Sequence, residues 1–338
     1  MESHNDYKNS ESTRIQWIDA LRALAIVIVV YSHCVSGWLP FFLLIGPIMM
    51  PLFFEISGYV YKIRDGRFLT LCVTIFYRIV VPWIMLVFLP VLLTFPIRSI
   101  DKTIKLCYNY ISGQTLWFIP CYIFAMMLFF FVLKLADFIF GASKTERMTM
   151  LGTMIICIAF SAFGYILCEL KILDFSMINR SMVVQFYFCL GYLFKKMTNE
   201  PFARNFHCGL TLLVLYILFV FYSYFIFPGE YIDVHLNHYF WLPYSVLLVL
   251  TGNLGLMVLA GTVKRYPYIL LFIGKNSLVI YLFHSWSFVV YDKIIEYFDF
   301  HLDILWLTGL IRAIFAILLC CLLAVFFNRK LPFVVGLK

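Results

Sequence analysis

Long apolar stretches follow one another along almost the whole chain, separated by short polar loops. A helix needs about 20 consecutive apolar residues to cross a bilayer. We place ten predicted spans at residues 17–38, 41–61, 68–94, 117–138, 148–168, 179–194, 206–227, 240–262, 268–291 and 304–327. The sixth is short and carries Arg180 and Gln185, so its apolar signal is the weakest. The pattern predicts an all-α, polytopic bundle of about ten transmembrane helices.

The composition excludes a water-soluble globule. Of the 338 residues, 63% are hydrophobic and only 13% are charged, whereas soluble proteins carry about 25% charged residues. The 37 Phe and 22 Tyr suit a lipid-facing surface with aromatic rings at its edges. No basic run suggests nucleic acid. The ten cysteines lack CxxC spacing and are expected to be reduced and packed.

Lysine and arginine predict the orientation, because cytosolic loops carry an excess of both. With the N-terminus in the cytosol, sixteen basic residues fall in inner segments and five in outer segments. The inner ones are Lys8, Arg14, Lys62, Arg64, Arg67, Lys134, Lys144, Arg147, Lys195, Lys196, Arg204, Lys264, Arg265, Arg329, Lys330 and Lys338. The outer ones are Arg98, Lys102, Lys105, Lys171 and Lys293. We therefore predict a multi-pass protein of the cell (inner or plasma) membrane with both termini cytosolic.

The chain is expected to form one domain. Residues 1–13 lack the basic start, apolar core and cleavage site of a signal peptide. We expect a cytosolic tail over 1–14, a transmembrane domain over 15–330 and a second cytosolic tail over 331–338. The segment 95–116 could lie along the outer surface as an amphipathic helix.

Ionisable residues inside a membrane are costly and indicate function. His33 follows Arg22 by eleven residues in the first span. Eleven residues turn a helix by about 1,100° and advance it by about 16 Å, so the two side chains share one face. Asp19 lies three residues before Arg22, near the same stripe. The first span is thus expected to carry an acid and a base near its inner end and an imidazole deeper in the membrane.

A second histidine is predicted at the same depth. His33 lies sixteen residues beyond Trp17, and His284 lies sixteen residues beyond Tyr268 in a span that runs the same way. At about 1.5 Å per residue both imidazoles reach the outer half of the membrane. A single buried histidine can instead be a neutral core residue bonded to a neighbour. Two histidines at one depth instead favour a shared site.

Other polar residues allow more than one interpretation. Glu55 in the second span must be paired, protonated or exposed to water; it marks either a site or a packing kink near Pro51. Arg78 either pairs inside the protein or binds an anion, and we favour the anion. The spacing of His235 and His238 could hold a metal, but a loop that meets a polar substrate is the better reading.

Four stretches resemble elements of one known family. Arg22 and His33 match an Arg-x₁₀-His signature, preceded by the pair Ile18-Asp19. The remaining matches are Pro51 to Tyr59, which resembles Phe-Phe-x-Ile-Ser-Gly-Tyr, Leu116-Trp117-Phe118, which resembles Leu-Trp-Phe, and Ile273 to His284, which resembles Gly-Lys-x-Ser…Tyr-Leu-x-His. In this order they resemble the acyltransferase-3 family of integral membrane acyltransferases. Glu55 stands where an apolar residue is usual, and Arg78 stands where a basic pair is common.

The resemblance implies transfer of an acyl group, usually acetyl, from cytosolic acetyl-CoA to a hydroxyl of a cell-surface polysaccharide or its lipid-linked precursor. His33 would be the general base and His284 a stabilising or relaying group, while Arg22 and Arg78 would orient the donor. The other residues expected to bind substrate are Asp19, Glu55, Ser57, Tyr59, Trp117 and Tyr281. The expected partners are acyl-CoA, a glycan or lipid-linked glycan and membrane lipids, with no metal.

Two other functions fit the same polar residues. A transporter or exporter could move a small solute or glycan past them, and a purely structural subunit of a polysaccharide assembly complex could retain them. We see no internal repeat with paired broken helices, which transport would favour.

Overall fold

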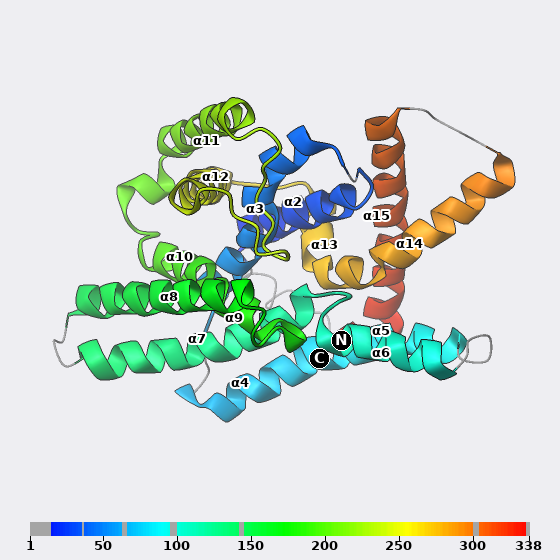
Figure 1. Cartoon of the computed structure of the whole chain (residues 1–338), viewed down its shortest axis with the longest axis horizontal. Coiled ribbons are helices and arrows are strands. Elements are labelled where there is room, and N and C mark those ends of the chain that lie inside the picture. Colours follow the sequence, from blue (N-terminus) through cyan, green and yellow to red (C-terminus); the bar gives the residue numbers. More distant parts are fainter. Residues whose placement is uncertain are drawn as a thin grey trace, which may run out of the picture.

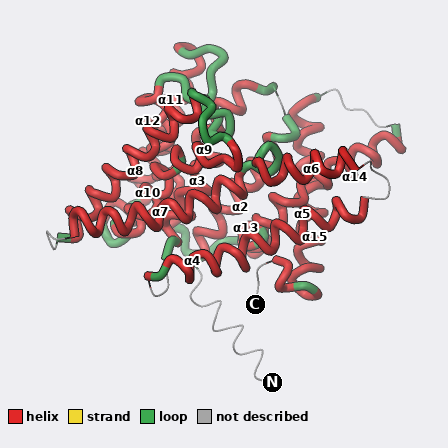
Figure 2. Tube along the Cα trace, turned by 60° about the horizontal axis from the view of Figure 1, so that its bottom comes forward, coloured by secondary structure: helices red, strands yellow, loops and turns green. Residues whose placement is uncertain are grey.

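The computed structural model describes residues 15–35, 37–62, 66–94, 100–141, 145–299 and 304–335. Helices and connecting loops make up this part of the chain, as Figure 2 shows, with one isolated bridge between Asp233 and His238. The predicted tail over 1–14 and the last three residues of the predicted C-terminal tail lie outside the described residues. The prediction of an all-α bundle is confirmed.

The α-helices, labelled in Figure 1, are α2 (Gln16–Ser32), α3 (Leu39–Val60), α4 (Phe68–Ile75), α5 (Val81–Thr94), α6 (Ile100–Ser112), α7 (Phe118–Phe140), α8 (Glu146–Glu169), α9 (Ile178–Val183), α10 (Gln185–Lys196), α11 (Phe206–Ile226), α12 (Leu242–Thr262), α13 (Tyr268–Lys275), α14 (Ser277–Phe298) and α15 (Leu305–Lys330). A π-helix, η2 (Phe76–Val80), joins α4 to α5.

Eight helices in the described part are long and apolar enough to cross a membrane, so the chain is a multi-pass membrane protein. Two of the ten predicted spans are not among them. The first, α2, has only 17 residues, and the sixth is divided at Val184 into α9 and α10. The predicted ninth span is also divided, because the backbone of Asn276 leaves the helical region between α13 and α14.

Helix α2 lies inside the bundle. Ala23, Ala25, Ile26 and Val30 have no exposed surface, and the helix packs against α3, α12, α13, α14 and α15. Figure 1 shows it between α3 and α13, with its end beside α15. An apolar helix covered by others needs no wide polar face, so its few polar residues stand out as candidates for function.

Glycines allow the closest helix contacts. A Cβ on Gly191 of α10 would lie 1.7 Å from the carbonyl oxygen of Glu55, and one on Gly58 of α3 would lie 1.9 Å from that of Phe188. A Cβ on Gly274 of α13 would lie 1.8 Å from the carbonyl oxygen of Asp19. Small residues bring membrane helices together because apolar side chains gain nothing by leaving lipid. In the α3–α10 and α2–α13 pairs, the two backbones are therefore in close contact.

The segment 95–116 contains a helix, as predicted, over the residues of α6. Ile100, Ile104, Tyr108 and Ile111 are exposed at three- and four-residue spacing, so they form one apolar stripe. Asp101, Lys102 and Lys105 are exposed on the rest of the helix. This is the pattern of a helix that lies in a membrane interface.

Candidate active site

His33 stands at the end of α2, where the helix stops. The helix ends at Ser32, and the next residues form a turn that carries the His33 side chain to an exposed position. The Ser32 hydroxyl donates to the carbonyl of Val29 at 2.8 Å, a local bond that competes with helix continuation. The prediction that the helix continues to residue 38 is therefore wrong, and His33 sits at a helix tip rather than within a helix.

His284 lies against His33. The two rings stack with centroids 5.1 Å apart and planes inclined by 29°. His284 is buried, with 3% of its surface exposed. The structure thus brings together the two histidines that helix geometry placed at one depth.

The orientation of His284 is fixed by its neighbours. Its Nδ1 lies 2.7 Å from the carbonyl oxygen of Tyr281, and its Nε2 lies 3.3 Å from the hydroxyl of Ser285. A carbonyl oxygen only accepts hydrogen bonds, so Nδ1 carries the proton of the neutral ring. Nε2 is then the acceptor and can exchange a proton with a neighbouring hydroxyl.

Trp117 and Tyr281, both predicted to bind substrate, reach the same region. The Tyr281 hydroxyl accepts a hydrogen bond of 3.3 Å from the backbone N–H of Phe118, and its ring lies 5.9 Å from that of His284. Trp117 precedes Phe118 and stacks on His235, with ring centroids 5.1 Å apart. The start of α7 therefore connects the histidine pair to the loop between α11 and α12.

From the sequence, His235 and His238 were a possible metal pair or, in the favoured interpretation, part of a loop that meets a polar substrate. In the structure, His235 stacks on Trp117, and the backbone of the next residue, Phe118, binds Tyr281, so the loop over residues 227–241 belongs to the site. His238 instead contacts Glu230, with 2.7 Å between Nε2 and Oε2. Within the residues described, no group of three or more His, Cys, Asp and Glu side chains is placed to hold a metal. The sequence signals for His235 were its position in a polar loop and its spacing from His238.

The loop over 227–241 is folded and anchored. The Asp233 carboxylate accepts from the backbone N–H groups of His235 and Leu236 at 2.8 and 3.1 Å. Asn237 donates to Glu169 at 3.0 Å, and Arg180 donates from Nε to the carbonyl of His235 at 3.2 Å. Burial lowers the pKa of the His235 imidazole, an effect that Asp233 opposes and Arg180 reinforces.

Arg180, which made the sixth span doubtful, has a structural role. Its guanidinium pairs with Asp174 in addition to holding the His235 carbonyl. Its side chain is largely buried, and such a charge is stable only when it is paired and hydrogen-bonded. The arginine therefore ties α9 to the loop over residues 227–241.

Asp19 and Arg22 form an ion pair, with Nη1 and Oδ1 3.5 Å apart. Asp19 is buried and Arg22 is partly exposed. The spacing of three residues on one helix predicted this contact. The pair lies near the end of α2 opposite His33, which the basic residues predict to be cytosolic.

Glu55 and Ser57 are held inside α3. Glu55 is fully buried and accepts from the side-chain nitrogen of Asn253 in α12 at 3.1 Å. Its other oxygen, Oε2, has no partner in the part of the chain described. The Ser57 hydroxyl donates to the Phe53 carbonyl at 2.6 Å. Of the three interpretations of Glu55, the structure shows an acid paired with Asn253 in the core. Within the described residues, neither Glu55 nor Ser57 is hydrogen-bonded to the two histidines.

In the part of the chain described, Tyr59 and Arg78 are neither hydrogen-bonded to His33 or His284 nor stacked on them. The Tyr59 ring meets that of Trp17 edge to face, 4.8 Å between centroids. Arg78 is exposed within the π-helix. The π-helix forms because Pro82 has no N–H to donate to the carbonyl of residue 78. Among the residues described, no ion pair or hydrogen bond of the Arg78 side chain is found.

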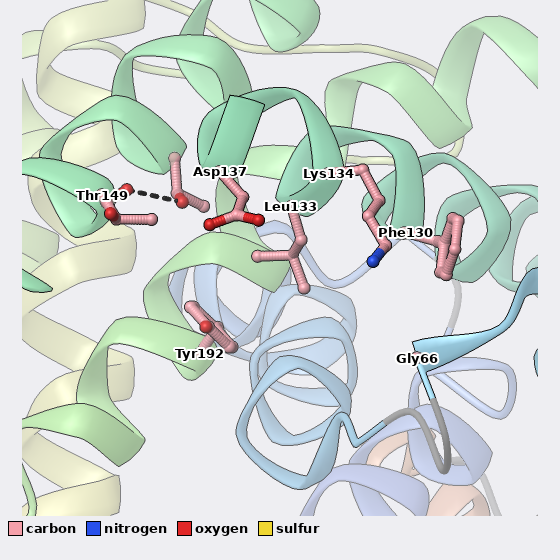
Figure 3. Close-up of a pocket in the computed structure, with 8 residues that line it drawn as sticks. Gly66, Phe130, Leu133, Lys134, Asp137, Thr149 and Tyr192 are labelled. Atoms are coloured by element: carbon pink, nitrogen blue, oxygen red, sulfur yellow. Dashed lines mark hydrogen bonds between the residues drawn. The ribbon is translucent and has the colours of Figure 1, made fainter. Parts of the chain in front are cut away.

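A cavity of about 260 Å³ opens between α7, α8 and α10. Figure 3 shows Leu133, Lys134 and Asp137 extending from α7, with Tyr192 of α10 opposite. No pattern in the sequence predicts this cavity. None of its lining residues belongs to the histidine site.

The family model described as an acyltransferase domain, that of the acyltransferase-3 family, matches residues 15–329. The match includes the histidine pair, Trp117, Tyr281 and the loop over 227–241. No curated protein and no solved structure matches the chain.

Proposed function

Because the chain belongs to the acyltransferase-3 family and is a membrane acyltransferase, we propose that it transfers an acetyl group from cytosolic acetyl-CoA. The acceptor in this proposal is a hydroxyl group of a cell-surface polysaccharide or of its lipid-linked precursor. The membrane would be the cell (plasma) membrane. No metal takes part.

The stacked pair of His33 and His284 carries the proposal. His33 is exposed and so can reach a hydroxyl group, whereas His284 is buried and oriented by the Tyr281 carbonyl. An imidazole is suited to removing a proton from an attacking hydroxyl, because its neutral ring has a free nitrogen that accepts the proton. We assign His33 as the general base and His284 as the residue that holds its ring.

The reaction needs little beyond that base. The acceptor oxygen attacks the thioester carbonyl while His33 takes its proton. The C–O bond forms, the C–S bond breaks, and the proton returns to the leaving thiolate of CoA. A hydrogen-bond donor near the carbonyl oxygen stabilises the charge that develops there. The phenol of Tyr281, whose ring lies 5.9 Å from that of His284, can be this donor.

The opposite end of α2 suits the donor. Arg22 is partly exposed although it is paired with Asp19, and a guanidinium binds phosphate through two parallel hydrogen bonds. Arg78 is a second exposed cation with no side-chain partner in the described part of the chain. We propose that Arg22 and Arg78 receive the phosphate groups of CoA.

Labelled acetyl-CoA and glycan extracted from cells without this protein test the proposal. The purified protein in lipid nanodiscs should move the label to the glycan, and His33→Gln should abolish the transfer. His207→Gln is the matched control, because His207 is exposed at the start of α11. Movement of glycan across sealed vesicles without acetyl transfer would instead support a transporter and contradict the proposal.

A further inference from the structure

A second cavity, of about 190 Å³, lies between α14, α15 and the turn that follows α2. Its polar and aromatic lining comes from Cys34, Tyr291, Asp292, Thr308 and Arg312, and Gly309 forms part of its wall. The sequence analysis assigned no role to any of these residues. Pockets for drug-sized ligands measure about 300–1,000 Å³, so this cavity suits a single small ring.

The cavity adjoins the proposed base. Cys34 directly follows His33 and contributes to the lining. Helix α15 touches the same turn, since a Cβ on Gly309 would lie 2.4 Å from Cγ1 of Val35. The Tyr31 hydroxyl also donates to the carbonyl of Trp306 at 3.2 Å. A ligand in the cavity is therefore held against the segment that carries His33.

Ring contacts connect one wall of the cavity to the histidine pair. The guanidinium of Arg312 lies over the ring of Phe288, 4.7 Å from its centroid. Phe288 in turn meets the ring of His284 edge to face at 5.6 Å. Arg312, Phe288 and His284 thus form a continuous line of contacts from the cavity to the stacked imidazoles.

The charges in the cavity favour an uncharged polar ligand. Arg312 and Asp292 form an ion pair of 2.5 Å, so their charges largely cancel. Ile295 and Leu305 form the apolar part of the wall, where the carbon atoms of a ring can pack. Hydroxyl groups of a ligand could accept from Arg312, donate to Asp292 and bond with the hydroxyls of Thr308 and Tyr291.

We propose that this cavity binds the acceptor as one uncharged sugar unit, with the reacting hydroxyl directed toward His33. The inference rests on the proposed acetyl transfer and names where its acceptor sits. The donor reaches His33 from the Arg22 end of α2, and the acceptor reaches it from the space between α14 and α15. Arg312, Asp292 and Thr308 then determine which sugar is acetylated.

Acceptor kinetics test the assignment. The probe is surface polysaccharide extracted from cells that lack this protein, assayed with labelled acetyl-CoA. Arg312→Gln and Thr308→Val should each raise the KM for the polysaccharide, by about 10-fold or more for Arg312, the usual worth of a hydrogen bond to a charged group. The KM for acetyl-CoA should stay unchanged, which shows that the variants are folded.

Lys293→Ala is the matched control, because Lys293 is next to Asp292 on α14 but is exposed and pairs with Glu296. Its KM for the polysaccharide should equal that of the wild type. Unchanged acceptor KM values in both Arg312→Gln and Thr308→Val would overturn the acceptor assignment while leaving the proposed function in place. A wild-type protein that acetylates no polysaccharide would overturn the proposed function and the assignment together.

Cys34 gives a second, chemical readout. A membrane-impermeant maleimide that modifies Cys34, identified by peptide mass spectrometry, should block transfer while acetyl-CoA binding remains. The polysaccharide should slow the modification, and Cys34→Ser should make transfer resistant to the reagent. Full transfer by protein that is modified at Cys34 would contradict the proposal.

Discussion

The ring of His33 at the end of α2 stacks on the ring of His284 in α14, with centroids 5.1 Å apart. His284 is itself fixed by the carbonyl of Tyr281, 2.7 Å from Nδ1. One imidazole is therefore exposed, and the other is buried and stacks against it. Mutations of the two should have different kinetic signatures.

His33→Gln should lower turnover by about 10²- to 10⁴-fold, the usual contribution of a positioned base, while CoA binding persists. Glutamine can keep one hydrogen bond but cannot accept a proton near neutral pH. His284→Phe keeps a flat ring for stacking and should lose less. Residues that act as one unit are not additive, so the double variant should be no slower than His33→Gln. An additive double variant would contradict the assigned roles.

Arg22→Ala should fold and insert but bind CoA about 10- to 100-fold more weakly, because the charge-assisted fork to phosphate is lost. Isothermal titration with CoA measures this, and Arg22→Lys should recover only part of the affinity. Arg265→Ala, in the loop before α13, is a control outside α2. CoA affinity equal to the wild type in Arg22→Ala would exclude Arg22 from the donor site.

The loop over 227–241 should loosen in acid. Burial lowers the pKa of His235 in the folded loop, whereas an unfolded loop titrates near the ordinary value of about 6.5. Between these values the open loop binds more protons, so loop stability rises with pH and is fully present above about pH 7. Arg180 adds to the lowering and Asp233 opposes it.

Hydrogen exchange of the backbone amides in 231–239 measures this opening. Exchange should accelerate as the pH falls below about 6.5, after correction for the intrinsic rate, while α12 stays protected. His235→Gln should remove the pH dependence. The same acceleration in His235→Gln would assign the effect to another group.

Gly191→Ala should destabilise the bundle by about 1–3 kcal/mol or more, since its Cβ would lie 1.7 Å from the Glu55 carbonyl oxygen. Thermal unfolding in detergent measures the loss. Gly261→Ala is the control, because its Cβ would meet only a carbonyl oxygen 3.9 Å away and alanine favours a helix. Equal stability of the two variants would show that α3 and α10 are not in close contact.

Topology follows from the distribution of lysine and arginine. Reporter fusions should place residues 195–205 and 264–265 in the cytosol and residues 228–238 outside. The loop that carries His235 would then face the acceptor side. An external signal from a reporter at residue 264 would contradict the ten-span arrangement.

The sequence predicted the bundle and the meeting of the two histidines, because helix rise and apolar length depend on local composition alone. It did not predict the turn at His33 or the break at Asn276. Both depend on side chains that compete for backbone carbonyls: the Ser32 hydroxyl donates to the carbonyl of Val29, and the Asn276 amide donates to that of Phe272. Asn276 also accepts a hydrogen bond from the side chain of Asn328. Although neither predicted span is one straight helix, the rings of His33 and His284 meet as predicted.

The members of the site that the sequence missed come from a loop. His235 is positioned by an Asx turn at Asp233, by Arg180 and by stacking on Trp117. No helical period relates these positions, so no spacing rule could have joined them. Glu55 shows the reverse case: an intramembrane acid suggested a site, and the structure pairs it with Asn253 in the core.

The position of α2 inside the bundle affects how the protein is made. α2 is the first of the described helices to leave the ribosome, but α13, α14 and α15, which cover it, are the last. At about 5–20 residues per second, the roughly 250 residues between them take on the order of 10 to 50 s to synthesise. During that time α2 can pack against α3 and then α12, but α13, α14 and α15 are still missing. A nascent chain of this kind needs the insertion machinery, or an early contact with α3, to hold its first helix until the last ones arrive.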